Sequence, residues 1–474
     1  MTKVAFSTRA RRKDSAMESS EVFRHIAKDG KDAGGLDLRV LGVSSDSGLN
    51  KLDCSLLRYR QASPNASLCM EMLQVSNLPV PPPTQTPILN LLRELQSGPA
   101  VIPRLNKLLG SMFSNGIKTF CQNHNITRVS IDLVGTHTPI LKRFQLPKTD
   151  DPNTYPLGWN TIIAAQTGLT VVFDFAVVES GIQRPQISPV AFVNRLLLRH
   201  PSKFRACLNI EELTNLSFIP NLSDGNARTT ICHDCGPGSL LIDYAMRYCT
   251  SNNNSEDHDG KYAVQGKANQ SIVDRFLGTH DYLRASPPLS IAREMFGDHE
   301  AQRLIDECIF LSMSDVDTVA TITRITAQNI LKQYHRLLKL YFPHNQKVDE
   351  LFICGPGARN SNIIDYLEAE LPESVITKPL DDIGLRGDAN EAVCYAHLAL
   401  EAALGKATHP STPSTPASSQ ANDDNVRGKI AHGTNWDTNL DRIIQFSKGE
   451  PLHVTKDVRV VGHLESDIKK LDIQ

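Results

Sequence analysis

A strand–turn–strand pattern followed by helical segments occurs twice in this chain of 474 residues, and this repeat limits the folds that the chain can adopt. The first copy contains Leu38–Ser45 and Leu52–Tyr59, and the second contains Ala206–Asn209 and Leu216–Ile219. Short apolar, β-branched runs are typical of strands, and a chain of this length is too long for one ordinary core. We therefore predict an α/β protein of two domains that face each other across a cleft.

Further strands and helices are expected around these strand pairs. We expect helices where apolar residues recur every three to four positions, and strands where short apolar runs are β-branched. The expected strands are Arg128–Thr136, Leu169–Phe175, Glu350–Cys354 and Val375–Lys378, and the expected helices are Pro87–Phe120 with a break at Gly98-Pro99, Ser188–Arg199, Pro237–Tyr248, Asp317–Phe342, Ser361–Leu371 and Ala389–Leu404. Thr250–Gln270 is expected to be a polar loop.

Changes in composition predict where the domains begin and end. The N-terminal residues are polar and aperiodic, and a Ser/Thr/Pro-rich stretch after residue 404 has no means of forming a core. The C-terminal residues contain one apolar patch, Ile443–Phe446, which we expect to dock on the body of the protein. We predict a disordered N-terminal tail, domain I, domain II, a linker and a C-terminal tail at residues 1–37, 38–203 plus 388–404, 204–387, 405–428 and 429–474.

Charge and hydropathy exclude several classes of partner. A formal net charge of -2 gives no electrostatic reason to expect nucleic acid or an anionic membrane as the main partner. The longest apolar runs, such as Gly168–Phe175, have the length of a strand rather than of a membrane span. No apolar signal-peptide core follows Met1, so we expect a cytoplasmic protein. Arg9–Lys13 resembles a weak organelle-targeting segment, but the acidic residues that follow favour a disordered tail.

The cysteines predict reduced, buried thiols rather than a disulfide framework. The chain has ten, and many lie inside apolar runs. Cys232 and Cys235 have the spacing of a redox motif or of half a zinc site. No second pair lies at zinc-site spacing, and we therefore predict neither a metal ligand nor a redox role for this cysteine pair.

Three segments combine a buried strand with a turn of small residues. They are Gly42–Asp53, Asn209–Ser217 with Asp234–Ser239 beyond it, and Cys354–Asn360. Small residues allow backbone N–H groups to approach an anionic oxygen closely, and a following helix N-terminus adds a favourable dipole. Taken singly, none of these turns predicts a binding site, because most glycine-rich turns only cap helices.

Taken in order, these segments resemble the anhydro-N-acetylmuramic acid kinases, a family within the actin, hexokinase and heat-shock-chaperone superfamily. The resemblance runs from Leu38 to Leu404. It rests on Gly42–Asp53, Gly135-Thr136-His137, Asp174-Phe175, Asn209-Ile210, Asn215-Leu216-Ser217, Asp234, Gly236-Pro237-Gly238, Asp243, Asp259-Gly260, Gly266-Lys267, Arg293-Glu294, Phe296, Asp317, Ala320-Thr321, Cys354-Gly355, Gly357 and Asn360.

This resemblance implies a two-domain actin-like ATPase and sugar-kinase fold with a central nucleotide cleft. It implies that ATP, with Mg²⁺, phosphorylates O6 of 1,6-anhydro-N-acetylmuramic acid while water opens the anhydro bridge at C1. Asp234 would be the base that activates this water. The alternative is that Asp234 only caps the helix after Gly238. Homodimers are common in the family, so a homodimer is an expectation from the resemblance alone.

The resemblance also implies which residues bind the small molecules. Nucleotide contacts are implied at Ser45, Asp46, Ser47, Gly48, Asn50, Asp53, Asn209, Gly236, Gly238, Gly355, Gly357 and Asn360. Contacts to the small-molecule amino sugar are implied at His137, Asp174, Arg293 and Glu294.

Several positions depart from the family pattern. In the first turn Asp46, Gly48, Asn50 and Lys51 replace a Gly, a Ser, an Asp and a Gly. In the second turn Glu211 and Glu212 replace paired glycines, and on the sugar side Ala176 replaces an Arg. At an effective dielectric of about 20, one like-charge contact near 4 Å costs on the order of 4 kcal/mol.

These departures leave three hypotheses. The chain is an active sugar kinase, or it is a catalytically impaired pseudokinase that binds nucleotide, sugar or a protein. The third hypothesis is that Asp46 and the two glutamates face solvent because the motif register is shifted by a residue or two.

Overall fold

The computed structural model describes most of the chain. It covers residues 35–46, 48–94, 101–138, 158–178, 189–221, 230–280, 283, 296–342, 346–405, 425–450, 452, 455 and 457–461. Among the expected features, residues 1–34 of the tail, most of the Ser/Thr/Pro linker, Ser47, Arg293 and Glu294 lie outside these ranges.

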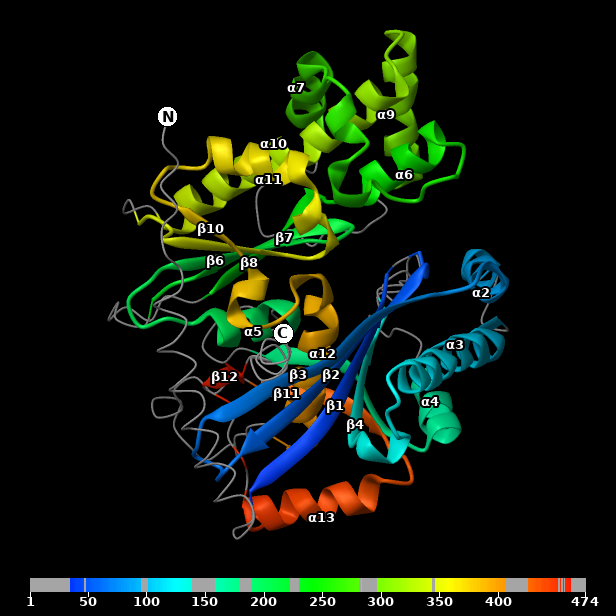
Figure 1. Ribbon diagram of the computed structural model, residues 1–474, viewed down its shortest axis with the longest axis vertical. Helices are drawn as coiled ribbons and strands as arrows, with labels where there is room; N and C mark the ends of the chain where they lie inside the picture. Colours follow the sequence, from blue (N-terminus) through cyan, green and yellow to red (C-terminus); the bar gives the residue numbers. More distant parts are fainter. Residues whose placement is uncertain are drawn as a thin grey trace, which may run out of the picture. The chain divides into compact units, whose positions relative to one another are not determined.

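The chain divides into two compact units, each built around one β-sheet (Figure 1). Unit 1 contains Met1–Pro189 and Glu391–Gln474, and unit 2 contains Val190–Asn390. Both units combine a mixed sheet with helices, which confirms the predicted α/β class. The contacts separate the units at 189/190 and 390/391, whereas the sequence predicts borders at 203/204 and 387/388.

The sheet of unit 1 has seven strands in the order β11-β5-β4-β1-β2-β3-β12. Their bounds are β1 Leu36–Ser45, β2 Lys51–Gln61, β3 Leu68–Pro79, β4 Leu133–His137, β5 Thr170–Val178, β11 Asn425–Ala431 and β12 Val458–Val461. Strands β1, β2 and β3 form an antiparallel meander, and β4 and β5 run parallel to β1. The residues predicted as the end of the linker and the C-terminal tail thus supply both outer strands of this sheet.

Helices cover both faces of this sheet. On one face α2 (Pro82–Glu94), α3 (Ile102–Asn123) and α4 (Trp159–Thr167) pack on alternate residues of β1 and β4, such as Leu41 and Val134. On the opposite face α12 (Asn390–Ala403) lies so close that a Cβ on Gly42 would stand 1.7 Å from the Ala392 carbonyl oxygen. Gly42 therefore serves helix packing. Helix α13 (Trp436–Ser447) follows β11.

The sheet of unit 2 repeats the central five strands of unit 1. Its order is β10-β9-β6-β7-β8, with bounds β6 Arg205–Ile210, β7 Leu213–Ile219, β8 Ile231–Pro237, β9 Glu350–Cys354 and β10 Ile376–Pro379. β6, β7 and β8 form an antiparallel meander, and β9 and β10 run parallel to β6. The same order and directions occur in β5-β4-β1-β2-β3, so the repeat in the sequence corresponds to a repeat in topology.

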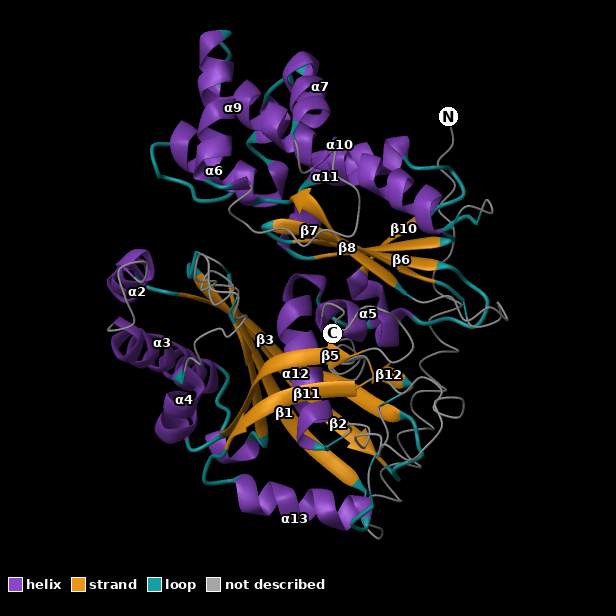
Figure 2. Cartoon of the chain, turned by 180° about the vertical axis from the view of Figure 1, so that it is seen from behind, coloured by secondary structure: helices purple, strands orange, loops and turns teal. Residues whose placement is uncertain are grey.

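Unit 2 carries most of its helices on one face of the sheet (Figure 2). Its helices are α5 Pro189–Leu198, α6 Leu240–Cys249, α7 Gln270–Thr279, α9 Asp298–Phe310, α10 Asp315–Tyr341 and α11 Ser361–Glu370. The long helix α10 packs Val319, Ile322 and Ile330 into the main core. On the other face, Leu198 of α5 packs on Phe352 of β9.

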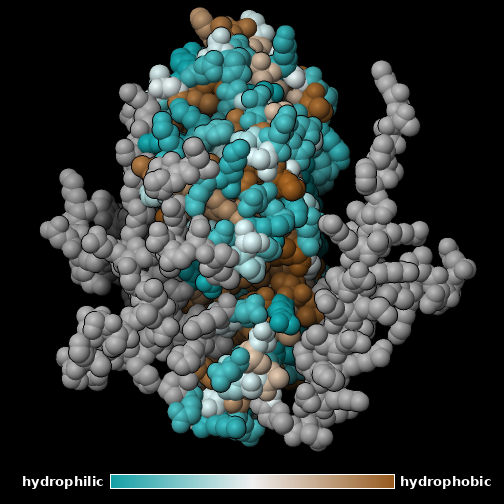
Figure 3. Space-filling view, turned by 90° about the vertical axis from the view of Figure 1, so that its left-hand side faces the viewer, coloured by the Kyte–Doolittle hydropathy of each residue, from teal (hydrophilic) through white to brown (hydrophobic). Residues whose placement is uncertain are grey.

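Several elements differ from the expectations. Strands β3 and β8 were not expected, and Arg128–Ser130 is a turn of 3-10 helix that precedes a shorter β4. The segment Ile231–Pro237 is polar and short, and it becomes a strand because it pairs with β7. No described helix is both long and apolar enough to cross a bilayer. On the face shown in Figure 3, hydrophobic and hydrophilic residues are interspersed over the described surface.

Candidate functional site

Three turns of unit 2, two of which contain glycine, meet at one end of its sheet. The β6–β7 turn lies between the turn after β8 and the turn after β9. A Cβ on Gly238 would stand 2.1 Å from the Glu211 carbonyl oxygen, and a Cβ on Gly355 would stand 2.7 Å from Asn209 Oδ1. A Cβ on Gly357 would stand 2.3 Å from the Ile210 side chain. The predicted residues Asn209, Gly236, Gly238, Gly355 and Gly357 thus lie in contiguous segments, which glycine allows to approach closely.

Asp234 lies inside strand β8, directly opposite Asn215 of β7. Its Oδ1 accepts a hydrogen bond from Asn215 Nδ2 at 3.0 Å, and the residue is half-buried. Helix α6 begins at Leu240 with Ser239 as its N-cap residue. The capping alternative for Asp234 is therefore wrong, because strand pairing places this carboxylate before the turn.

The two glutamates of the β6–β7 turn bind the start of α6 through their backbones. The Glu212 carbonyl accepts from the amides of Gly238 and Leu240 at 2.8 and 3.2 Å, and the Glu211 carbonyl accepts from the Ser239 amide at 2.8 Å. These amides would otherwise belong to the unsatisfied first turn of the helix. Three of the amides nearest the Gly-Pro-Gly turn are thus already bonded within the protein.

A second carboxylate, Asp243, lies in the first turn of α6. Burial raises its pKa, the hydrogen bond from Ser239 Oγ at 2.7 Å lowers it, and the charge of Glu212 raises it, with a resulting pKa of about 7. This carboxylate therefore changes its protonation state near neutral pH.

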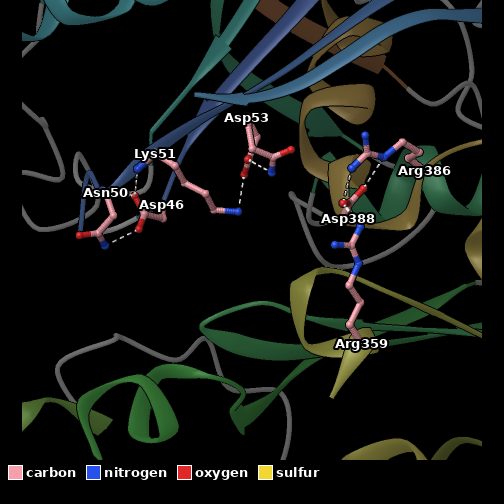
Figure 4. A network of polar contacts seen from close by, with 8 residues as sticks. Asp46, Asn50, Lys51, Asp53, Arg359, Arg386 and Asp388 are labelled. Carbon is pink, nitrogen blue, oxygen red and sulfur yellow. Dashed lines mark hydrogen bonds and ion pairs between the residues drawn. The ribbon is translucent and has the colours of Figure 1, made fainter. Parts of the chain in front are cut away.

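The turn after β9 borders a pocket of about 220 Å³. Its lining includes Ile353, Gly355, Ala358, Arg359, Ile364, Glu368, Thr377, Lys378, Asp381 and Asp388. Asp388 accepts hydrogen bonds from Arg386 at 2.6 and 3.0 Å and pairs with Arg359 (Figure 4). The predicted nucleotide residue Asn360 caps α11, because its Oδ1 accepts from the Asn362 amide at 3.1 Å.

In unit 1 the β1–β2 turn holds the carboxylate of Asp46 (Figure 4). Its Oδ1 accepts from the amides of Asn50 and Lys51 at 2.7 and 3.3 Å, and its Oδ2 accepts from Asn50 Nδ2 at 2.6 Å. The turn also binds Gln85 of α2, whose Nε2 donates to the Gly48 carbonyl at 2.8 Å. The carboxylate therefore lies where the turn's own amides converge, as a bound anion would.

The other predicted residues of this turn also have partners within unit 1. Asp53 pairs with Lys51 at 3.1 Å and accepts from Asn77 Nδ2 at 2.7 Å. Ser45 Oγ donates to Thr138 Oγ1 at 2.8 Å, and both residues are buried. Ser45 ends β1, and Thr138 directly follows β4.

The predicted sugar-binding residues His137 and Asp174 lie on the neighbouring strands β4 and β5. His137 stacks on Tyr395 of α12, with ring centroids 4.3 Å apart. Asp174 has a φ of +56°, which is unusual for a residue with a side chain, and pairs with Lys429 of β11. Arg293, Glu294 and Ser47 lie outside the described residues.

Two of the matched motifs have structural roles. Asp317 accepts a hydrogen bond from the Lys267 amide at 2.6 Å, which lowers the pKa of its carboxyl. Thr321 Oγ1 accepts from the Asn269 amide at 2.9 Å. A Cβ on Gly266 would stand 2.1 Å from the Val316 carbonyl oxygen. These residues fasten the loop before α7 onto α10.

The described residues contain no group of three or more His, Cys, Asp or Glu side chains placed to hold a metal ion. Cys232 Sγ donates to Asn215 Oδ1 at 3.1 Å, and Cys235 Sγ donates to the His233 carbonyl at 3.4 Å. Burial raises the pKa of the Cys232 thiol to about 12 and that of Cys235 well above its usual range. Both thiols therefore stay protonated, which disfavours redox or zinc chemistry at this pair.

Comparison with known proteins gives one consistent family. The model of the family described as anhydro-N-acetylmuramic acid kinase matches residues 38–423. Two relatives with that name are the protein of Caldanaerobacter subterraneus subsp. tengcongensis and that of Bacillus cereus strain AH820. The first is 28% identical over 401 residues and covers 83% of this chain and 96% of the relative. The second is 29% identical over 397 residues and covers 82% of this chain and 98% of the relative.

Solved structures give more distant matches. An activator of 2-hydroxyisocaproyl-CoA dehydratase from Clostridium difficile is 11% identical and covers 77% of this chain and 95% of its own, with a TM-score of 0.37. A ROK family glucokinase from Streptomyces griseus is 12% identical and covers 77% of this chain and 99% of its own, with a TM-score of 0.33.

Proposed function

Because the chain belongs to the anhydro-N-acetylmuramic acid kinase family, we propose that it transfers a phosphoryl group from ATP to an anhydro amino sugar. The acceptor that we propose is 1,6-anhydro-N-acetylmuramic acid, with phosphorylation at O6 and opening of the anhydro bridge by water. The observation that carries this proposal is the half-buried Asp234 beside the three converging turns of unit 2.

Asp234 is the residue to which we assign proton removal from the attacking water. A carboxylate has about four lone-pair sites, so the hydrogen bond from Asn215 leaves acceptor capacity for a water proton. Asn215 contacts Oδ1 from the neighbouring strand and thereby limits the rotation of the side chain. The proton passes from water to the carboxylate as the water oxygen attacks C1 and the C1–O6 bond of the anhydro bridge breaks. The released O6 takes the phosphoryl group from ATP, and ADP leaves.

The pocket beside Gly355 is the place that we propose for the base of the nucleotide. Its walls combine apolar groups of Ile353, Ala358 and Ile364 with the guanidinium of Arg359. Such a mixture of apolar surface and a few polar groups is typical of nucleotide-base and drug-sized ligand sites. Its volume of about 220 Å³ suits the base rather than the whole nucleotide.

Mg²⁺ is the metal that we propose, and when bound it screens the charge of the transferring phosphoryl group. Mg²⁺ in kinase sites takes most of its ligands from phosphate and water and only one or two from protein carboxylates. The half-buried carboxylate of Asp234 would contact such an ion only through a water molecule, because direct ligation would remove the basicity that the proposed proton transfer needs.

One observation favours the alternative of an impaired pseudokinase. The Asp46 carboxylate, which stands where the family pattern has a glycine, accepts hydrogen bonds from the amides of Asn50 and Lys51 in the first turn. These N–H groups are then not available to phosphate oxygens. The alternative predicts that the chain binds a ligand without transferring phosphate.

A thermal-shift titration with Mg-ATP, with and without the anhydro sugar, tests the proposal first. A ligand at a hundred times its dissociation constant stabilises the folded state by about 2.7 kcal/mol. We expect a raised melting temperature with ATP, and a phosphorylated sugar by mass spectrometry. Binding without transfer supports the pseudokinase, and neither binding nor transfer contradicts both.

Reversion of the second turn separates two causes of low activity. We expect Glu211→Gly with Glu212→Gly to raise the rate of an inefficient wild type, because both side chains and their charge are removed. If the rate does not rise, the cause of the low activity lies in the residues that bind the sugar. The homodimer and the cytoplasmic location stay predictions, and light scattering on purified protein tests the first.

A further inference from the structure

Three completely buried polar side chains bind the backbone that directly follows Asp234. Asn329 Nδ2 donates to the Cys235 carbonyl at 2.7 Å, and Thr326 Oγ1 donates to the Gly238 carbonyl at 2.9 Å. Thr214 Oγ1 donates to the Gly236 carbonyl at 3.2 Å. Thr326 and Asn329 come from helix α10, and Thr214 comes from strand β7.

The backbone after Asp234 needs these donors because it leaves the regular strand ladder. Asn215 pairs with Asp234 and Thr214 pairs with Gly236, so Cys235 is the extra residue of a β-bulge. Gly236 then adopts a φ of +122°. A buried carbonyl that loses its partner destabilises the folded state. The three side chains donate to the carbonyls of Cys235, Gly236 and Gly238, which lie at and directly after this interruption.

Asn329 also fills the space beside Gly236, directly after the bulge. A Cβ on Gly236 would stand 2.6 Å from Asn329 Nδ2, so the amide group fills the place of a side chain at that position. Gln333, one turn further along α10, donates to Asn329 Oδ1 at 3.5 Å. Thr326, Asn329 and Gln333 lie at helical spacing on one face of α10, and all three are buried.

A β-bulge changes the direction in which the neighbouring side chain points. Asp234 directly precedes the bulge, and Asn215 contacts its carboxylate from β7. The direction of the carboxylate therefore depends on the backbone at 235–238, which α10 holds. A displacement of about 1 Å at a reacting group can lower a rate about a hundredfold.

We propose that Asn329 and Thr326 of α10, together with Thr214, are positioning residues that set the direction of the Asp234 carboxylate. This inference rests on the proposed function, because it assigns a purpose to the geometry around the proposed base. Thr326 and Asn329 lie outside the matched motifs, and Thr214 is an unmatched position within Asn209–Ser217. The contacts join residues that are 22 to 94 positions apart.

A matched pair of substitutions at Thr326 tests the proposal. Thr326→Val keeps the shape but removes the hydroxyl, whereas Thr326→Ser keeps the hydroxyl but removes a methyl group. We expect the Val variant to lose about tenfold or more in kcat with an unchanged KM for ATP, and the Ser variant to stay within about threefold of wild type. A role in folding alone predicts equal kcat values for the folded fractions of both variants.

Thr323 provides a control on the same helix. It is similarly buried, and its Oγ1 has no hydrogen-bond partner among the described residues. We expect Thr323→Val to leave kcat unchanged. Asn329→Leu keeps the branch at Cγ, removes the donor to the Cys235 carbonyl, and is expected to lower kcat about a hundredfold.

Hydrogen exchange of the peptide that covers β8 measures how firmly this segment is held, and it does not require catalytic activity. We expect faster exchange at Asp234–Gly238 in Thr326→Val and Asn329→Leu, but not in Thr326→Ser or Thr323→Val. Unchanged exchange, or equal kcat values in the Thr326 pair, overturns the proposal. A wild type that transfers no phosphate overturns the proposed function instead, and the exchange rates then decide whether these side chains hold the segment.

Discussion

The two units share the order and direction of five strands, but they stabilise their first hairpin turns in different ways. In unit 1, the β1–β2 turn is closed by the side-chain carboxylate of Asp46 on the amides of Asn50 and Lys51. In unit 2, the β6–β7 turn is closed by backbone carbonyls of Glu211 and Glu212 on the amides that start α6.

The bonds that close the two turns therefore respond differently to a substitution. One substitution removes the carboxylate from the turn of unit 1, whereas the carbonyls in unit 2 remain whatever side chain is present. A duplicated topology thus keeps the path of the backbone while each copy binds its turn amides differently. The four predictions below test this comparison, from the largest expected effect to the smallest.

We expect the general base, Asp234, to lie in unit 2. Asp234→Asn keeps the hydrogen bond from Asn215 geometrically feasible but removes the basic oxygen. We expect kcat to fall by about 10²–10⁴-fold, the usual contribution of a positioned base, with little change in ATP affinity. Steady-state kinetics with titration calorimetry measures both, and a kcat within about threefold of wild type would place the base elsewhere.

The backbone of unit 2 should tolerate added volume less well than that of unit 1. Gly238→Ala places a Cβ 2.1 Å from a backbone oxygen, and we expect a loss of about 3 kcal/mol in the free energy of unfolding. Gly48→Ala in unit 1 meets mainly the end of the flexible Asn50 side chain, and we expect a loss of less than about 1 kcal/mol. Urea unfolding measures both, and equal losses would contradict the comparison.

Removal of the carboxylate in unit 1 should favour binding of a nucleotide. Asp46→Ala exposes the amides of Asn50 and Lys51 and removes a negative charge. We expect the Kd for ATP to fall about tenfold, or about 1.4 kcal/mol, while the turn itself loses about 1 kcal/mol of stability. Asp46→Asn is the matched control, because it keeps an acceptor without the charge. An unchanged Kd in both variants would favour the shifted-register hypothesis, with the turn outside the phosphate site.

The stability of unit 2 should depend on pH, because Asp243 lies in the first turn of α6. The pKa of Asp243 is raised to about 7, so the folded state binds its proton more tightly than the unfolded chain does. Its contribution to stability is present below the unfolded pKa and is lost as pH rises through about 7. We expect Asp243→Asn to be more stable than wild type at about pH 8 and close to it near pH 4, because the Asn side chain carries no charge at either pH. Thermal unfolding across this range measures the difference, and a constant difference would contradict the raised pKa.

Local sequence patterns predicted most of the regular structure. The strands at Leu38, Leu52, Ala206 and Glu350 and the long helix after Asp317 follow the spacing of apolar residues, which depends only on neighbours in the chain. The sequence also identified the glycine turns, because a glycine indicates a place where two backbone segments approach closely. Strand β8 escaped this reasoning, since its residues are polar and pair only because β7 lies beside them.

The sequence by itself determined the α/β class, the repeat of the strand pattern and the family. Only the tertiary structure decided that Asp234 lies in a bulged strand and that Asp46 binds its own turn. It also brought Thr326 and Asn329 onto the backbone next to Asp234. The reason is physical: periodicity and turn chemistry are local, whereas a hydrogen bond between residues 94 positions apart exists only after the elements pack.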